Sequence, residues 1–146
     1  MSPETAIIAA VAVPLIGAVL IFLNGRTANV REAVTVITAI VTFCIVTTLF
    51  DDVASGARPS VTVLEMLPGL GITFTMEPLG MLFAGVASGL WIVTSIYAVG
   101  YMRGHHEINQ TRFYTCFAIA ISSAIGIAFA GNMLTLFVFY EILTLS

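Results

Sequence analysis

The sequence contains no lysine, and its five basic residues are all arginines, set against eight acidic residues in a chain of 146. The net charge of −3 comes without any cluster of basic side chains. Binding to phosphates needs grouped Lys and Arg, so nucleic acid is excluded as a partner. Cys44 and Cys116 both lie inside apolar runs. We interpret them as small packing residues that carry no information about the redox compartment.

Motifs for cofactor chemistry are also missing from the sequence. It has no nucleotide-binding loop, no nucleophile–base pair and no haem attachment pattern. His105 and His106 are adjacent in one segment and have no cysteine partner, which is not a recognisable metal-ligand spacing. We therefore expect the chain to hold no cofactor and no metal.

Apolar residues are what the sequence has in abundance. They make up 59% of the chain, only 9% is charged, and the mean hydropathy is +1.06. These values are typical of an all-α integral membrane protein of the cell membrane, here a single transmembrane domain over residues 1–146. The apolar runs predict helices over residues 5–23, 33–50, 78–99, 113–130 and 133–146. The last run makes only ~21 Å of helix, too short to cross a ~30 Å hydrocarbon layer, so we expect the native subunit to continue beyond Ser146.

The stretch between the second and third predicted helices does not have a helical pattern. Residues 61–76, VTVLEMLPGLGITFTM, are rich in β-branched side chains, and Pro68, Gly69 and Gly71 interrupt them with residues typical of turns. The pattern predicts a short β-hairpin lying at the membrane surface.

The arginines also predict the orientation of the chain. Arg26, Arg31, Arg103 and Arg112 fall in the first and third loops, which share one side of the membrane if every helix crosses. Arginine-rich loops are cytoplasmic as a rule. The N-terminus and the hairpin loop, which carries Arg58 among four acidic residues, are then expected outside.

One carboxylate lies inside the last apolar run. Glu141 stands eight residues after Met133 in GNMLTLFVFYEILTLS. At 1.5 Å per residue it lies ~12 Å into the hydrocarbon, close to the midplane. An isolated ionised carboxylate at that depth costs at least ~2.5 kcal/mol, so the side chain must be neutral, paired or near water. Intramembrane acids of this kind are functional by default.

The residues around Glu141 also carry a family resemblance. The segment RFYTCFAIAISSAIGIAFAGNMLTLFVFYEILTLS resembles part of the antiporter-like subunits that Mrp-type cation/proton antiporters, respiratory complex I and membrane-bound hydrogenases share. In that family a run of the form AGN, hydrophobic residue, LTLFV, then Trp or Tyr before Glu, opens the fifth helix. MEPLG at 76–80 is similar to the family's DPLG, with Glu77 replacing the usual aspartate, and SIYAVGYMRG at 95–104 is similar to its YM segment. The tyrosine before the acid is most similar to the D-type subunit of Mrp antiporters.

The resemblance implies that Glu141 is part of a proton path. It implies a proton-translocating subunit of a multisubunit Na⁺/H⁺ antiporter, with other membrane subunits, protons and Na⁺ as partners. A proton-pumping subunit of complex I or of a hydrogenase is the alternative, and only then would the chain belong to an oxidoreductase. A non-conducting structural subunit is a third possibility. The family's path also uses lysines in later helices, so we expect the partner of Glu141 to lie outside this sequence.

Four further residues are weaker candidates for the path. Tyr140 precedes the acid and either packs or lines water, and Thr144 is one turn from Tyr140 on the same helix. His105 and His106 lie in the third loop. Histidine is the residue type suited to exchanging protons near physiological pH, so they could collect protons there, although a loop histidine is usually only solvated.

Overall fold

The computed structural model describes residues 2–146, except for the side chains of residues 66 and 67. The elements in chain order are α1 (Pro3–Leu23), α2 (Ala28–Thr48), α3 (Phe50–Ala54), β1 (Ser60–Leu67), β2 (Leu70–Thr75), α4 (Pro78–Gly104), α5 (Gln110–Ala128) and α6 (Met133–Leu145).

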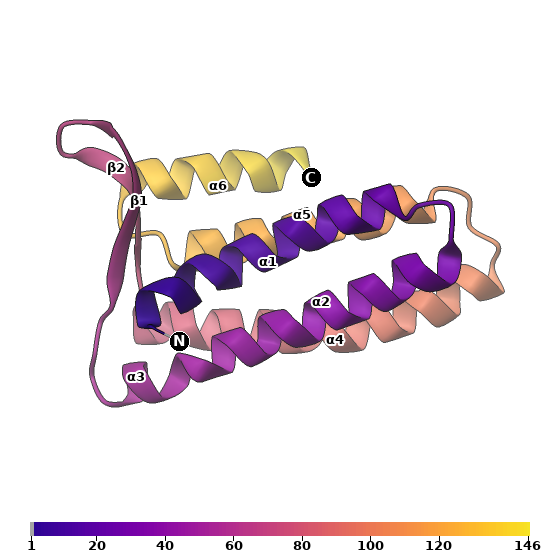
Figure 1. Cartoon of the computed structure of the whole chain (residues 1–146), viewed down its shortest axis with the longest axis horizontal. Helices are drawn as coiled ribbons and strands as arrows, with labels where there is room; N and C mark the ends of the chain where they lie inside the picture. The colour runs from indigo at the N-terminus through magenta and orange to yellow at the C-terminus, as the bar shows by residue number, and fades with distance from the viewer. Residues whose placement is uncertain (1) are drawn as a thin grey trace.

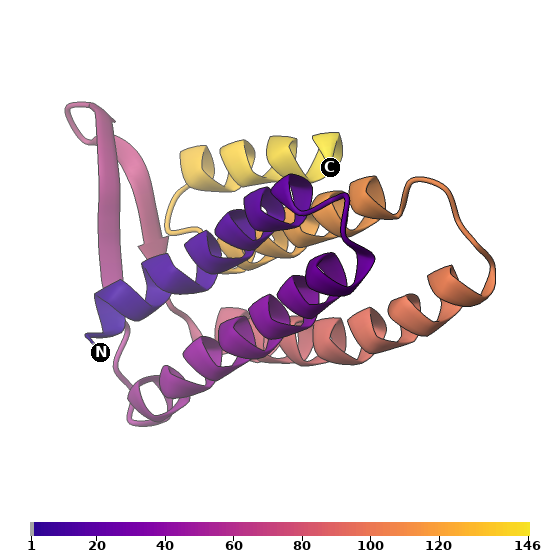
Figure 2. The ribbon, with the colours of Figure 1, turned by 45° about the vertical axis from the view of Figure 1, so that its right-hand side comes forward.

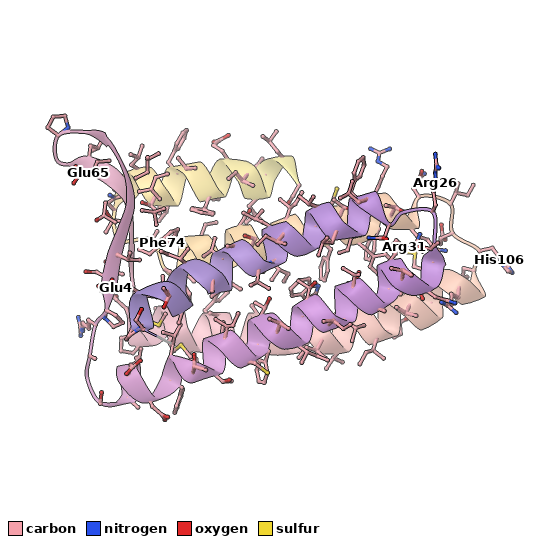
Figure 3. The ribbon with its side chains drawn as sticks, viewed as in Figure 1. Glu4, Arg26, Arg31, Glu65, Phe74 and His106 are labelled. Carbon is pink, nitrogen blue, oxygen red and sulfur yellow. The ribbon has the colours of Figure 1, made fainter. Side chains whose placement is uncertain are left out.

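The long helices form a closed antiparallel bundle. Helix α1 packs on α2 and α5, and α4 packs on the same two helices (Figure 1). One end of the bundle, here the arginine end, carries Arg26, Arg31, Arg103 and Arg112, and the opposite hairpin end carries the N-terminus and both strands (Figures 1 and 3). Helix α6 lies outside this bundle, against α5 and β2.

The helix lengths fit a membrane. Helices α1, α4 and α5, together with α2 continued through α3, give four segments long and apolar enough to cross a bilayer. The fifth apolar helix, α6, is shorter. The predicted fold class, four spans, a further short helix and a hairpin, is therefore confirmed, and the chain is a multi-pass membrane protein.

At the arginine end, the helices are longer than the sequence predicts. Helix α2 begins at Ala28, before the predicted start at residue 33, so Arg31 and Glu32 belong to the helix and not to the loop. Helix α4 continues to Gly104 rather than stopping at residue 99, and α5 begins at Gln110 rather than 113. The reason is that polar side chains in these turns bond to one another across the bundle, as described below, and so need not face solvent.

The hairpin end shows smaller differences. Helix α1 begins at Pro3 rather than residue 5, because Ser2 caps it by accepting a bond from the Thr5 amide. The acidic pair Asp51–Asp52 does not end the second span, since both lie in the first turn of α3, where a helix N-terminus favours negative charge. Helix α5 ends at Ala128, not 130, because the backbone that follows bonds to β2. Helix α6 ends at Leu145, one residue before the predicted end.

The predicted hairpin is present as two antiparallel strands, β1 and β2. Gly69 at its turn has φ +82°, a left-handed conformation that glycine adopts without steric cost. Thr62 and Thr73 face each other across the strands with their hydroxyl oxygens 3.1 Å apart. Figure 2 shows that the hairpin runs across the end of the helices rather than along them. The hairpin therefore extends from the end of α3, which precedes β1, to the beginning of α6, which contacts β2.

The two ends of the bundle give a test of orientation. Ser60 on β1 and Asn109 before α5 are both exposed, at the hairpin end and the arginine end respectively. In a background with Cys44 and Cys116 replaced by serine, we expect an impermeant thiol reagent to label the Asn109→Cys variant from the cytoplasm and the Ser60→Cys variant from outside. Labelling of the Ser60→Cys variant only from the cytoplasmic side would reverse the predicted topology.

Candidate functional site

Helix α6 presents two different faces. Thr135 and Phe139 are buried, and the Phe139 ring lies 5.5 Å from that of Phe74 on β2. On the opposite side Phe137, Glu141 and Leu145 follow one another at intervals of four residues, and all three are exposed. The carboxylate therefore lies in the middle of an apolar surface that points away from the bundle.

A set of hydrogen bonds holds the first turn of α6 against the hairpin. The Asn132 side chain caps the helix by accepting from the Thr135 amide at 2.8 Å, and it donates to the Gly71 carbonyl at 2.6 Å. The Thr135 hydroxyl donates to Asn132 Oδ1 and accepts from the Thr73 amide, at 2.7 and 2.9 Å. The Gly131 amide donates to the Thr73 carbonyl at 2.8 Å. We call these five bonds the hairpin clamp.

The clamp explains part of the sequence pattern before Glu141. A Cβ atom on Gly131 would meet the Thr73 carbonyl oxygen at 3.1 Å and would press still closer on the Thr75 hydroxyl, so only glycine fits without displacing the strand. Asn132 and Thr135 supply the side-chain bonds of the clamp. The AGN and LT positions of the pattern thus set where α6 starts and how it leans on the hairpin, which determines where Glu141 lies.

Glu141 itself has no ionic contact within residues 2–146. Both ion pairs in this described part of the chain involve Glu32 instead. Its neighbour Tyr140 is 57% exposed and lines an open pocket of about 690 Å³ between α4, α5 and α6. The Thr144 hydroxyl donates to the Tyr140 carbonyl of its own helix at 2.9 Å. Tyr140 and Thr144 thus share α6 with Glu141, and neither hydroxyl is shown bonding to the carboxylate.

The two histidines lie elsewhere. Both are exposed in the loop between α4 and α5, at the arginine end, whereas α6 starts at the hairpin end (Figures 1 and 3). The His105 ring stacks on Tyr101 at 4.2 Å between centroids, and its Nδ1 lies 3.1 Å from the Tyr101 carbonyl. His106 has φ 52°. The structure therefore does not bring these side chains together with Glu141.

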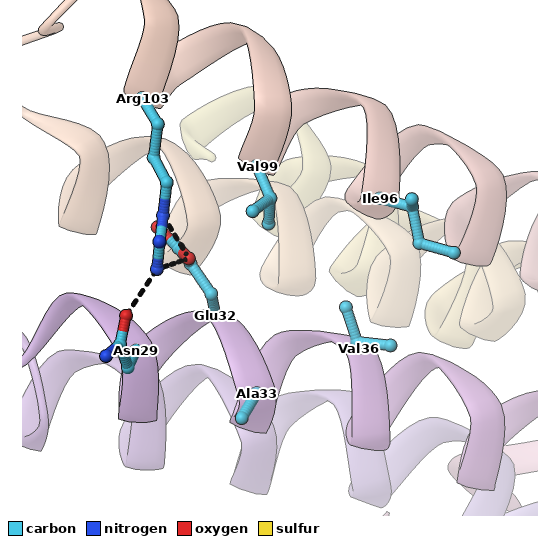
Figure 4. A pocket seen from close by; sticks show the side chains of 7 residues that line it. All are labelled: Asn29, Glu32, Ala33, Val36, Ile96, Val99 and Arg103. Carbon is cyan, nitrogen blue, oxygen red and sulfur yellow. Dashed lines mark hydrogen bonds and ion pairs between the residues drawn. The ribbon is translucent and has the colours of Figure 1, made fainter.

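A charge cluster at the arginine end, in which Arg31 and Glu32 are buried and the Arg103 side chain is 51% exposed, was not anticipated from the sequence. Glu32 is only 5% exposed, and its two oxygens accept from Arg103 Nε at 2.9 and 3.2 Å. Arg103 also donates to the Asn29 side chain, so α2 and α4 are bonded through one guanidinium (Figure 4). Arg31 Nη2 lies 3.7 Å from Glu32 on the other side. One carboxylate thus lies between two guanidinium groups.

Arg31 connects the same cluster to α5. Its Nη2 donates to Gln110 Oε1 at 2.6 Å and its Nη1 to the Thr111 hydroxyl at 3.1 Å. The guanidinium carbon lies 5.6 Å from the centre of the Tyr114 ring, within the range of a cation–π contact. Arg31 and Glu32 are thus adjacent on α2, but Arg31 bonds to α5 and Glu32 bonds to α4. A charged pair next to the start of a predicted span is the signal in the sequence that could have revealed this cluster.

Sequence comparison gives two informative relatives. The chain is 30% identical over 106 residues to a probable K⁺/H⁺ antiporter subunit, designated A/B, of Rhizobium meliloti (strain 1021), which covers 71% of this chain and 10% of that protein. It is 27% identical over 109 residues to the A1 subunit of a Na⁺/H⁺ antiporter of Staphylococcus aureus (strain bovine RF122 / ET3-1), which covers 73% of this chain and 13% of that protein. No protein-family model matches the chain.

The chain belongs to the antiporter-like subunit family. It spans about a tenth of the length of these curated relatives. A solved structure of the membrane-bound sulfane sulfur reductase, an archaeal respiratory membrane complex, shares the fold: the TM-score is 0.78 over 99% of this chain and 22% of that one, at 19% identity. The two sequence relatives carry the designations A/B and A1, so they do not single out the D-type subunit, which stays a prediction for this antiporter-like chain.

The charge cluster of this antiporter-like chain should be important for its stability. The Glu32→Ala change leaves the buried Arg31 without a carboxylate beside it and removes the bonds that join α2 to Arg103 of α4. We expect a clearly lower melting temperature of the purified assembly. Glu107→Ala, which removes an exposed carboxylate at the same end, is the matched control and should have little effect. Equal melting temperatures for both variants would contradict this role of Glu32.

The hairpin clamp can be tested separately. Asn132→Ala removes the helix cap, worth roughly 1–2 kcal/mol, and also the bond to Gly71. Amide hydrogen exchange in β2 and in the first turn of α6 should then become faster by roughly 5- to 30-fold. Asn109→Ala is the control, because Asn109 precedes α5 but makes no capping bond with its side chain. Unchanged exchange in the Asn132→Ala variant would show that the clamp does not hold α6.

Proposed function

We propose that this chain is part of a proton-translocating subunit of a multisubunit Na⁺/H⁺ antiporter, and that Glu141 binds and releases the proton. The observation that carries the proposal is the position of this carboxylate, within an apolar helix and on the face that the bundle leaves open. Its relatives bear the names of cation/proton antiporter subunits, which supports the same interpretation.

The energetics favour a role in transport over a passive one. An ionised carboxylate near the middle of a bilayer costs at least ~2.5 kcal/mol, and no ion pair within residues 2–146 offsets this cost for Glu141. Phe137 and Leu145 flank it on the same exposed face, so bare lipid would surround the acid. We therefore propose that another membrane segment covers this face and brings a cationic group or water to the carboxylate.

The clamp fits this proposal because a proton-carrying group must be held at a defined place. Asn132 and Thr135 join the start of α6 to β2, and Phe139 packs on Phe74 one turn later. Glu141 follows Phe139 by two residues, on the other side of the helix. The inner face of α6 is thus anchored, while the outer face is available to a neighbouring segment.

Three alternatives to a Na⁺/H⁺ antiporter subunit remain: a subunit that exchanges another cation, a subunit of a redox-driven proton pump, and a subunit that conducts nothing. One relative is named for K⁺ and another for Na⁺, so the cation is part of the proposal. A subunit of complex I or of a hydrogenase would use the same acid in a pump driven by redox chemistry. A structural subunit that conducts nothing has no need of an acid at this depth, so the behaviour of Glu141 separates it from the conducting alternatives.

Substitution of Glu141 tests the proposed function. Glu141→Gln keeps the size of the side chain and much of its hydrogen bonding but cannot titrate, so proton flux in everted vesicles should be strongly reduced. Glu141→Asp keeps a titrating group and should retain part of the flux. If Glu141 were only structural, the Glu141→Gln variant should transport better than the Glu141→Asp variant. The reason is that Gln can satisfy a neutral hydrogen-bond network that the shorter Asp does not reach.

Two controls make this result interpretable. Glu65→Gln, on the exposed hairpin strand β1, should transport normally, since it removes a carboxylate away from α6. Each variant must also be present in the assembled complex at the wild-type level. Near-normal transport by a fully assembled Glu141→Gln variant would rule out Glu141 as the proton carrier.

A further inference from the structure

The surface of the bundle has a groove between α2 and α4 near the arginine end. Its volume is about 300 Å³, and its lining residues are Asn29, Glu32, Ala33 and Val36 of α2 and Ile96, Val99 and Arg103 of α4 (Figure 4). Positions 29, 33 and 36 follow one another at intervals of four and three residues, and positions 103, 99 and 96 do the same in the opposite chain direction. Such intervals mark one face of a helix, so the groove runs along the two antiparallel helices.

The polar residues of this groove are all at one end. Asn29 and Glu32 lie in the first turns of α2, and Arg103 lies in the last turn of α4. The other four lining residues are apolar. Ile96 is seven residues from Arg103, so the apolar part reaches ~10 Å into the membrane from the polar end. The hydrocarbon of one leaflet is ~15 Å deep. The groove therefore has the polarity order of a phospholipid and covers much of the length of one leaflet.

The polar end of the groove has an excess of positive charge and free hydrogen-bond donors. Glu32 lies between the Arg31 and Arg103 guanidinium groups, which leaves one net positive charge on the cluster. Arg103 bonds through Nε and Nη2 only, so its Nη1 has no bond within residues 2–146. Asn29 accepts from Arg103 through Oδ1, and its Nδ2 donates to no group in the same part of the chain. Free donors beside a positive charge suit the oxygens of a phosphate group.

The apolar part of the groove faces away from the bundle. Ile96 is 59% exposed, and the adjacent surface of α2 exposes Ile37, Ile40 and Val41. Both helices are long and apolar enough to cross a membrane. An exposed apolar surface of this kind meets acyl chains in a bilayer, and basic pockets between transmembrane helices bind anionic lipid headgroups.

We propose that the groove between α2 and α4 binds one anionic phospholipid of the leaflet at the arginine end. Its phosphate group accepts from Arg103 Nη1 and Asn29 Nδ2, and one acyl chain lies along the apolar residues of the groove. A zwitterionic lipid fits less well, because Glu32, the one carboxylate that lines this groove, is 5% exposed and already bonded to Arg103. A choline or ethanolamine group therefore meets no free carboxylate there. The site does not involve Glu141 and is independent of the proposed function.

Photolabelling of the assembled complex tests the lipid site. The probe is phosphatidylglycerol with a diazirine on one acyl chain, and the comparison is phosphatidylcholine with the same chains, each added at a low fraction to bilayers that contain the complex. Phosphatidylglycerol should label residues 33–36 and 96–99 several-fold more than phosphatidylcholine does. Equal labelling by the two lipids would indicate ordinary boundary lipid, and no labelling would indicate that another protein segment covers the groove. Either result would overturn the proposal.

Three variants separate a specific site from general attraction of lipid to positive charge. Asn29→Ala removes one free donor but keeps Glu32 bonded to Arg103, so the preference for phosphatidylglycerol should fall several-fold. Ala33→Leu fills part of the groove and should reduce labelling by both lipids. Arg26→Gln removes an exposed arginine at the same end that does not line the groove, and it should leave the preference unchanged. With all variants assembled at the wild-type level, equal losses in Arg26→Gln and Asn29→Ala would contradict a specific site.

Discussion

The need to satisfy every polar group without bulk water is the constraint on which the rest of this structure depends. The long helices meet it for the backbone, and Thr35, Thr42 and Ser88 meet it for their hydroxyls by donating to carbonyls of their own helices. The ends of the bundle meet it with side chains: Glu32 lies between two arginines at one end, and the hairpin clamp bonds loop to strand at the other.

Two sets of groups do not meet this constraint with partners in residues 2–146. Glu141 is a carboxylate on an apolar face with no ion pair in the described part of the chain. The Tyr114 hydroxyl and Trp91 Nε1 are buried with no hydrogen-bond partner in residues 2–146. The acid faces outward, and we propose that a further protein segment covers it.

Glu141 could be found from the sequence because its position depends on local information. An acid eight residues into an apolar helix lies ~12 Å along it, which is near the midplane if the helix crosses the bilayer from its first residue. The Arg31–Glu32–Arg103 cluster could not be found in this way, because Glu32 and Arg103 are 71 residues apart. They meet only once α2 and α4 pack together. Sequence patterns also place charges in loops by default, so helices α2, α4 and α5 were predicted too short at the arginine end.

The sequence by itself determined the membrane class, the number of spans, the hairpin and the expected depth of Glu141, because apolar run length, turn residues and helix rise are properties of neighbouring residues. Only the tertiary structure decided which charges are buried, how the hairpin clamps α6, and which buried polar atoms find a partner. Those features depend on contacts between helices distant in sequence. A hydroxyl such as that of Ser95 or Ser88 has the same local sequence context whether its partner is a carbonyl, a water or nothing, and only packing distinguishes these cases.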